Sequence, residues 1–198
     1  MSKVSMDLIQ ELRNKTGLGM MDCKKALVAA DGNIEKAVEE LRKKGAAVAQ
    51  KRAGKDTAEG IVYSYIHPGS QLGVLIEINC ETDFVARLDD VQKFAKDMCM
   101  QIAALKPTFL APEDVDEAFL EKEKAILKEQ LAASGKPANI VEQIVKGKLN
   151  KIYSEICLLK QPYVKDDKKT IEQVIEELIA RTGENIKIKK FSRLEIGA

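Results

Sequence analysis

The spacing of apolar residues changes near residue 59, and this change limits the classes of fold that the chain can adopt. Across residues 1–45, apolar side chains recur every three or four residues, as on the buried face of a helix. Residues 61–66 and 74–78 are instead rich in β-branched and aromatic side chains, and the His-Pro-Gly-Ser segment between them is typical of a turn. A helical first part followed by a strand hairpin predicts an α+β protein.

The first part of the chain predicts three short helices joined by tight turns. Ser5 and Asn33 are placed to cap the first and third helices, and the Thr-Gly-Leu-Gly segment 16–19 separates the first from the second. Basic residues precede Gly45, which we expect to end the third helix. The predicted organisation is a three-helix domain (1–45), a helical extension that frays into a linker (46–58), and an α+β domain (59–198).

The α+β domain is predicted to hold a three-stranded antiparallel sheet and an antiparallel helix pair. Asp89, with Gln92 three residues later, is a capping-box-like start for a strongly amphipathic helix. Two long helices separated by a short turn should lie antiparallel. The remaining elements are predicted as a turn at 134–137 inside that pair, a helix over 174–180 that Thr170 can cap and Gly183 stops, and a strand at 186–191.

The composition excludes several kinds of active site. The 198 residues include one His and no Trp, so a site built from several histidines is impossible. The four cysteines contain no Cys-x-x-Cys pair, which argues against a metal cluster and against a disulfide scaffold. Because 32 Lys and Arg balance 31 Asp and Glu, a general nucleic-acid binder is not expected either. We predict no catalytic residue, metal ligand or cofactor, and an interaction protein rather than an enzyme.

Targeting segments and membrane spans are also not expected. The first residues lack a basic region followed by an apolar run and a small-residue cleavage site. No stretch of ~18 apolar residues occurs in the sequence. We therefore predict a cytoplasmic protein with no membrane partner.

Two places are not explained by helix or strand periodicity. Met21 lies about 100° around the second helix from the core residue Met20, so it belongs either to a partner surface or to a face that is exposed by chance. Phe84, in the segment 80–87, lies between the end of a strand and the Asp89 helix start. An aromatic side chain at such a junction either fills the core or is held out for a partner, and the pattern alone leaves both open.

Two long segments resemble signatures of the bacterial elongation factor Ts family. One is Leu12-Arg13-Asn14-Lys15-Thr16-Gly17-Leu18-Gly19-Met20-Met21-Asp22-Cys23-Lys24-Lys25-Ala26-Leu27, and the other is Glu77-Ile78-Asn79-Cys80-Glu81-Thr82-Asp83-Phe84-Val85-Ala86-Arg87. Both occur in the order and spacing of the family, and the resemblance covers nearly the whole chain. It implies a guanine-nucleotide exchange factor for elongation factor Tu.

The resemblance also implies how the two segments would act. The three-helix domain would be similar to ubiquitin-associated (UBA) domains and would dock on the G domain of elongation factor Tu, in its GDP-bound or nucleotide-free form. Its contact residues would be Leu12, Arg13, Met20 and Met21.

In the second segment, the implied contact residues are Thr82, Asp83, Phe84 and Val85. Phe84 would be a wedge, that is, a side chain that inserts into the partner, with Asp83 as its polar neighbour. Its insertion would help to dislodge the Mg²⁺ beside GDP. The metal and the nucleotide would belong to the partner, so no cofactor is implied for this chain.

One departure concerns length and assembly. Longer family members carry a second copy of the α+β subdomain, whereas one copy is present here, so the chain resembles the short form. We therefore predict a homodimer joined through the α+β domain. Two rival hypotheses are an adaptor whose three-helix domain binds ubiquitin-like polypeptides, and an RNA-binding translation accessory that uses basic residues such as Lys187, Lys189 and Lys190.

Overall fold

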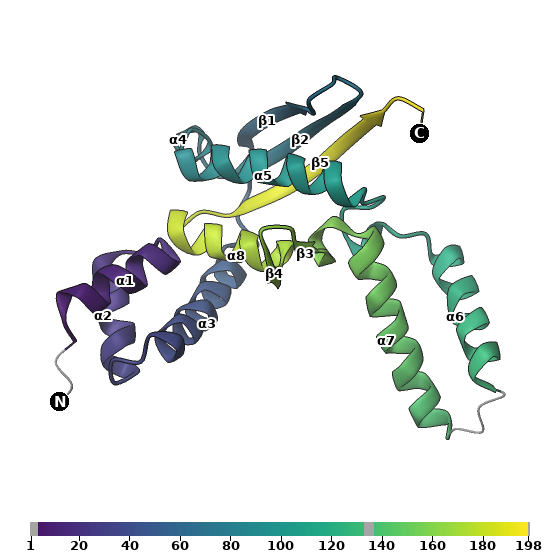
Figure 1. Ribbon diagram of the computed structural model, residues 1–198, viewed down its shortest axis with the longest axis horizontal. Coiled ribbons are helices and arrows are strands. Elements are labelled where there is room, and N and C mark those ends of the chain that lie inside the picture. The colour runs from purple at the N-terminus through teal and green to yellow at the C-terminus, as the bar shows by residue number, and fades with distance from the viewer. Residues whose placement is uncertain (1–3, 133–136, 198) are drawn as a thin grey trace. The chain divides into compact units, whose positions relative to one another are not determined.

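The computed structural model describes residues 4–132 and 137–197, and that part of the chain contains eight α-helices and five β-strands (Figure 1). Three strands form one sheet in the order β1–β2–β5, and β3 pairs with β4 in a separate two-stranded sheet. The predicted α+β class is therefore confirmed. The chain divides into two compact units: the first comprises residues up to Val62, Glu77–Ala95 and Gln173–Lys189, and the second comprises Tyr63–Ile76, Lys96–Glu172 and the residues from Lys190 onward.

The N-terminal helices lie in the first unit and have the predicted caps. They are α1 (Met6–Thr16), α2 (Met20–Ala29) and α3 (Ile34–Arg52). The Ser5 hydroxyl accepts from the Leu8 N–H at 3.3 Å, and the Asn33 side chain accepts from the Lys36 N–H at 2.9 Å. Their shared core consists of Ile9, Leu12, Cys23, Ala26, Leu27, Ala30, Ala37 and Leu41. Three helices around one small core are thus confirmed, while the likeness to UBA domains stays a prediction.

The predicted end of the third helix at Gly45 is wrong, because α3 continues without a break to Arg52. Gly45 is buried, and a Cβ added to it would lie 3.2 Å from the Cβ of Ala180. The glycine therefore permits a close approach to α8 (Ile171–Thr182) instead of ending a helix. The helical extension is confirmed as far as Arg52. The division at 45 and 58 into domains stays a prediction.

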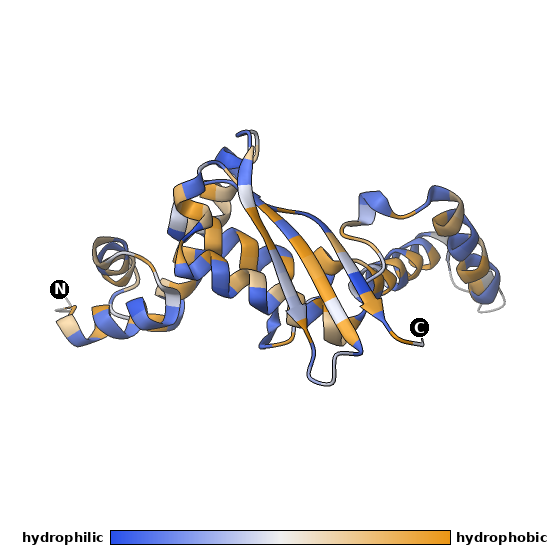
Figure 2. Cartoon of the chain, turned by 90° about the horizontal axis from the view of Figure 1, so that it is seen from above, coloured by the Kyte–Doolittle hydropathy of each residue, from blue (hydrophilic) through white to orange (hydrophobic). Residues whose placement is uncertain are grey.

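The three-stranded sheet is antiparallel and consists of β1 (Glu59–Ile66), β2 (Leu72–Cys80) and β5 (Ile186–Glu195). β1 and β2 form the predicted hairpin. The Ile196 N–H, just after β5, donates to the Gln71 carbonyl, just before β2, at 2.9 Å, so these strands also run in opposite directions. The inward residues of β2 are Val74, Ile76, Ile78 and Cys80, each at most 3% exposed. Figure 2 shows apolar residues along all three strands.

Two helices that flank the sheet segments in sequence begin close to their predicted positions. α5 (Asp89–Leu105) starts at Asp89, but the capping-box detail is wrong, because the Gln92 side chain donates to the Ala86 carbonyl at 2.9 Å. α8 begins at Ile171, directly after Thr170, the expected cap residue, and ends just before Gly183, whose φ is +77°. A short helix that was not predicted, α4 (Asp83–Ala86), lies between β2 and α5.

The second unit contains the long helix pair α6 (Glu117–Ala132) and α7 (Ala138–Ile156). These helices lie side by side (Figure 1) and share a small cluster around Leu127, Val145 and Leu149. Most of the turn predicted at 134–137 lies outside the described residues. The third strand was predicted to end at 191, but β5 extends four residues further, to Glu195.

A short hairpin of β3 (Pro162–Tyr163) and β4 (Asp166–Thr170) was also not predicted. It is fixed to α5 by the buried carboxylate of Asp97, which accepts from the Tyr163 hydroxyl at 2.7 Å and from the Lys165 ammonium at 2.6 Å. Burial and the neighbouring Asp97 carboxylate raise the pKa of the Tyr163 phenol.

Candidate partner-binding site

The segment after β2 folds into α4 because Thr82 caps it. The Thr82 backbone is extended, with φ −131° and ψ 153°, and its hydroxyl accepts from the Val85 N–H at 3.4 Å. Val85 and Ala86 are 4% and 3% exposed and anchor the inner side of this single turn. The outer side therefore faces solvent.

Phe84 lies on that outer side and is 70% exposed. This placement excludes one of the two alternatives that the sequence left open, because the ring does not fill the core, and a role in partner binding stays a prediction. Phe94, by contrast, is 5% exposed in α5, as its helical spacing predicts. A large apolar side chain held in water by a capped turn is typical of an interaction surface.

The other predicted members of this segment are placed differently from one another. Asp83 is exposed and forms an ion pair with Arg87, four residues later, which is also exposed. Thr82 is exposed at the start of the turn, whereas Val85 faces inward. The structure thus brings Asp83 and Phe84 to the surface, with Thr82 and Val85 in positions that support them.

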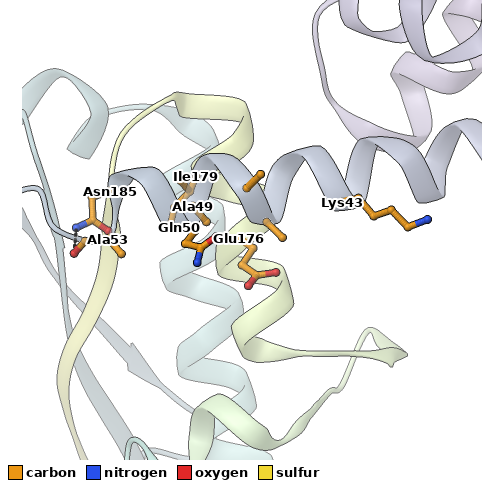
Figure 3. Close-up of a pocket in the computed structure, with 9 residues that line it drawn as sticks. Lys43, Ala49, Gln50, Ala53, Glu176, Ile179 and Asn185 are labelled. Carbon is orange, nitrogen blue, oxygen red and sulfur yellow. Dashed lines mark hydrogen bonds between the residues drawn. The ribbon is translucent and has the colours of Figure 1, made fainter. Parts of the chain in front are cut away.

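The residue before Thr82 connects this segment to α3. The Glu81 carboxylate accepts from the Asn185 N–H at 2.6 Å and pairs with the Arg52 guanidinium at 3.2 Å. Asn185 is 2% exposed, and its side-chain amide donates to the carbonyls of Ala53 at 3.4 Å and Lys55 at 2.9 Å. Figure 3 shows the Asn185 side chain directed at Ala53, just after the end of α3.

The N-terminal residues that were predicted to contact a partner separate into exposed and buried ones. Met21 is 63% exposed on α2, and Arg13 on α1 is also exposed. Met20 is half-buried against the three-helix core, and Leu12 is fully buried in it. Met21 shares its flank of α2 with the exposed Lys25 and with Val28, which is 58% exposed, so this flank combines apolar and basic side chains.

The His and Cys side chains in the described residues are hydrogen-bonded or buried. His67 pairs with the Tyr65 hydroxyl through Nδ1 at 3.0 Å. All four cysteines are buried, and burial raises the pKa of the Cys99 thiol to about 12 and that of Cys157 to about 11. Within residues 4–132 and 137–197, no group of three or more His, Cys, Asp or Glu could hold a metal ion.

A shallow pocket of about 610 Å³ lies between α3 and α8 (Figure 3). Its lining includes three alanines of α3, Ala53 just after that helix, Lys43 at one end and Glu176 on α8. Most of the lining side chains are small and apolar, and the Lys43 ammonium pairs with the Glu39 carboxylate at 2.9 Å. In the described part of the chain, none of the helices has the length and apolarity that crossing a bilayer requires.

Comparison with known proteins identifies the family to which these segments belong. The family model described as elongation factor TS matches residues 3–198. The chain belongs to the elongation factor Ts family. It is 53% identical over 197 residues to elongation factor Ts of Desulforamulus reducens, covering 100% of this chain and 91% of the relative.

Two further relatives support the same assignment. Elongation factor Ts of Caldanaerobacter subterraneus subsp. tengcongensis is 52% identical over 194 residues, covering 98% of this chain and 97% of the relative. That of Thermotoga petrophila is 53% identical over 195 residues, with the same two coverages. The resemblance inferred from two segments is thus confirmed over the whole chain, and with it the assignment as a translation elongation factor.

Sequence reasoning missed the residues that hold α4 in place. The family segment 77–87 contains Glu81 without giving it a contact role, and no sequence pattern pointed to Glu184. Glu184 contacts Thr82 across 102 positions, so no local spacing could have linked them. Figure 1 shows why they meet, since β2 and β5 are neighbours in the sheet, and these residues lie at the end of one strand and the start of the other.

Proposed function

We propose that this chain is a guanine-nucleotide exchange factor that binds elongation factor Tu·GDP, dislodges Mg²⁺ and promotes GDP release, so that GTP can bind. The single observation that carries the proposal is the exposed Phe84 on a capped turn, within a segment that matches the family. The chain would make and break no covalent bond, and would therefore not be an enzyme in the chemical sense. Its place of action would be the cytoplasm, with the translation machinery.

The mechanism follows from thermodynamic linkage. If bound GDP weakens the partner's affinity for this chain by some factor, the chain must weaken GDP binding by the same factor. Each tenfold of this coupling corresponds to ~1.4 kcal/mol. Insertion of Phe84 beside the bound Mg²⁺ would supply the coupling, because the ring and the metal–nucleotide complex would compete for the same region of the partner.

Docking would use the exposed flank of the N-terminal helices. Met21 on α2 offers a flexible apolar side chain, and the exposed Arg13 on α1 offers a planar cation. Met20 would contribute its exposed part. We assign Leu12 a supporting role, because its side chain is 0% exposed and packs inside the three-helix core.

The direct test is stopped-flow release of a fluorescent GDP from purified elongation factor Tu·Mg²⁺ on mixing with this chain. We expect release to accelerate and to saturate with concentration of the chain. Absence of acceleration would refute the proposal. Steeply salt-dependent RNA binding without acceleration would support the RNA-binding alternative instead.

We also propose that two copies of the chain associate through the outer face of the sheet. In the second unit, this face exposes Ile66 (62%), Leu75 (49%), Leu194 (74%) and Ile196 (74%). Leu75 alternates with the buried Val74 and Ile76 and so lies on the opposite face of β2. Two apolar sheet faces pack well against each other, and a second copy supplies an identical face.

Sedimentation equilibrium tests this assembly. We expect a dimer at micromolar concentration and a monomer for Leu75→Lys, which places a charge on the face without disturbing the buried side of β2. A wild-type chain that stays monomeric at micromolar concentration, both alone and with elongation factor Tu, would contradict the proposal.

A further inference from the structure

We propose that Glu184 is a positioning residue, which holds α4 so that Phe84 is presented to the partner before the two proteins meet. This inference rests on the proposed exchange function and extends it to a residue that itself does not touch the partner's nucleotide. Glu184 lies in the turn between α8 and β5 and is only partly exposed.

The Glu184 carboxylate makes two hydrogen bonds to Thr82. One oxygen accepts from the Thr82 N–H at 3.0 Å, and the other accepts from the Thr82 hydroxyl at 2.8 Å. The hydroxyl oxygen in turn accepts from the Val85 N–H at 3.4 Å. Glu184 therefore fixes the direction of the hydroxyl proton, which leaves the oxygen free to cap α4.

A second, reciprocal hydrogen bond joins the segments 81–82 and 184–185. The side chain of Glu184 binds the backbone N–H of Thr82, while the side chain of Glu81 binds the backbone N–H of Asn185 at 2.6 Å. Each acidic side chain thus satisfies the backbone donor next to the other. Such reciprocal hydrogen bonds fix both position and register of two segments, as a capping box does at a helix start.

The turn that carries Phe84 needs this support. α4 has four residues, and a helix of that length does not persist on its own, because nucleation is unfavourable. Its inward contacts come from Val85 and Ala86, while the largest side chain, Phe84, is 70% exposed and adds little burial. The hydrogen bonds to Glu184 therefore supply a large share of the order of this segment.

Order before binding has a kinetic consequence. A side chain that is already ordered loses little conformational entropy when it enters the partner. A mobile side chain loses that entropy during insertion, which slows the step. Docking through the N-terminal helices would precede insertion, so loss of Glu184 should slow the insertion step and leave docking nearly unchanged. Loss of two hydrogen bonds at a partly exposed position corresponds to about a tenfold slower step.

The test compares Glu184→Ala, Thr82→Val and the double variant with the wild-type chain. In stopped-flow GDP release we expect Glu184→Ala to lower the maximal rate about tenfold, with the half-saturating concentration unchanged within about twofold. The effects in the double variant should combine to less than their product, because both substitutions remove the hydroxyl–carboxylate hydrogen bond, whereas only Glu184→Ala also removes the one to the backbone N–H of residue 82. Thr82→Ser keeps both donors, so in the free chain the amides of residues 83–87 should stay as protected from hydrogen exchange as in the wild type.

The matched control is Glu172→Ala, which removes an exposed ion pair with Lys160 from the first turn of α8. We expect it to leave the maximal rate unchanged. A wild-type maximal rate for Glu184→Ala, or effects of the two substitutions that multiply in the double variant, would overturn the inference.

Hydrogen exchange of the free chain separates this inference from the proposed function. We expect the amides of residues 83–87 to exchange about tenfold faster in Glu184→Ala, with an unchanged thermal midpoint for the core. If the wild-type chain fails to accelerate GDP release, the proposed function fails on its own. If the amides of 83–87 exchange as in the wild type, the positioning role fails, whatever the partner assay shows.

Discussion

Replacing Phe84 with Ala separates the stability of the chain from its proposed action. Only about a third of the Phe84 side chain is buried, since it is 70% exposed. Burying a whole Phe side chain is worth up to ~3 kcal/mol, so the free energy of unfolding should fall by less than ~1 kcal/mol. Capping by Thr82 does not involve the ring, and α4 should persist.

The exposed part of the ring sets the size of the effect on exchange. An aromatic side chain buries roughly 200 Å² in full, so about 140 Å² of Phe84 would remain to be buried on insertion into a partner. At ~25 cal/mol per Å², this corresponds to about 3.5 kcal/mol, or an upper limit of roughly 300-fold in rate. We expect the maximal rate of GDP release to fall by about 10- to 100-fold.

The assay is stopped-flow release of fluorescent GDP at saturating concentration of the chain, accompanied by thermal melts of each variant. Phe119→Ala is the matched control, because Phe119 is 41% exposed on α6, and its removal should change the rate by less than about twofold. If Phe84→Ala releases GDP as fast as the wild type while wild-type acceleration is intact, the reasoning about the ring is refuted. A thermal midpoint that falls steeply would refute the placement of the ring instead.

Three further outcomes are expected. Met21→Ala should raise the half-saturating concentration of the chain about tenfold in the same assay and leave the maximal rate unchanged, because Met21 would contribute to docking only; an unchanged half-saturating concentration would exclude Met21 from the contact. Tyr163→Phe should reduce the alkaline loss of stability. The pKa of the Tyr163 phenol is raised from its usual 10.0 by burial and by Asp97, so above pH 10 the unfolded chain loses this proton first and the free energy of unfolding falls as the pH rises. Urea melts at pH 8 and pH 10.5 measure the effect, and an equal loss in both proteins would contradict it. The four cysteines are buried, so at pH 8 an aromatic disulfide reagent should react with them slowly in the native chain and fully in denaturant, and the proposed dimer should run as a monomer on a non-reducing denaturing gel.

Much of the fold was predictable because local side-chain chemistry determines it. Ser5 and Asn33 cap helices as expected, since each needs only the backbone of the next three residues. The strand hairpin and the start of α5 follow from equally local signals. The exposed Met21 was also predictable, because helical spacing alone places it beside the core stripe.

The errors occurred where a distant segment decides the local structure. Gly45 has the appearance of a helix end, but it serves a close approach to Ala180, 135 positions away in the chain. The same holds for the β3–β4 hairpin, which is fixed by the buried Asp97 of α5. Hydrophobic periodicity carries no information about which of two distant segments will meet.

The candidate site was predictable in its location but not in its construction. The interrupted periodicity around Phe84 marked a ring without a core position, and the structure shows that ring in solvent. The hydrogen bonds from Glu184 that hold the turn could not be inferred, because an acidic residue in a helix-to-strand turn is ordinary in composition.

The continuity of α3 makes the chain sensitive to changes of length between residues 34 and 52. A flexible linker absorbs an inserted residue, but a helix converts it into a rotation of about 100° and a shift of about 1.5 Å. One residue added after Gln50 would therefore turn the flank of Met21 by more than a quarter of a circle relative to Arg52 and its partner Glu81. Four added residues would bring the flank back to within about 40° of its original direction, so the number of residues in α3 determines which way the N-terminal helices face.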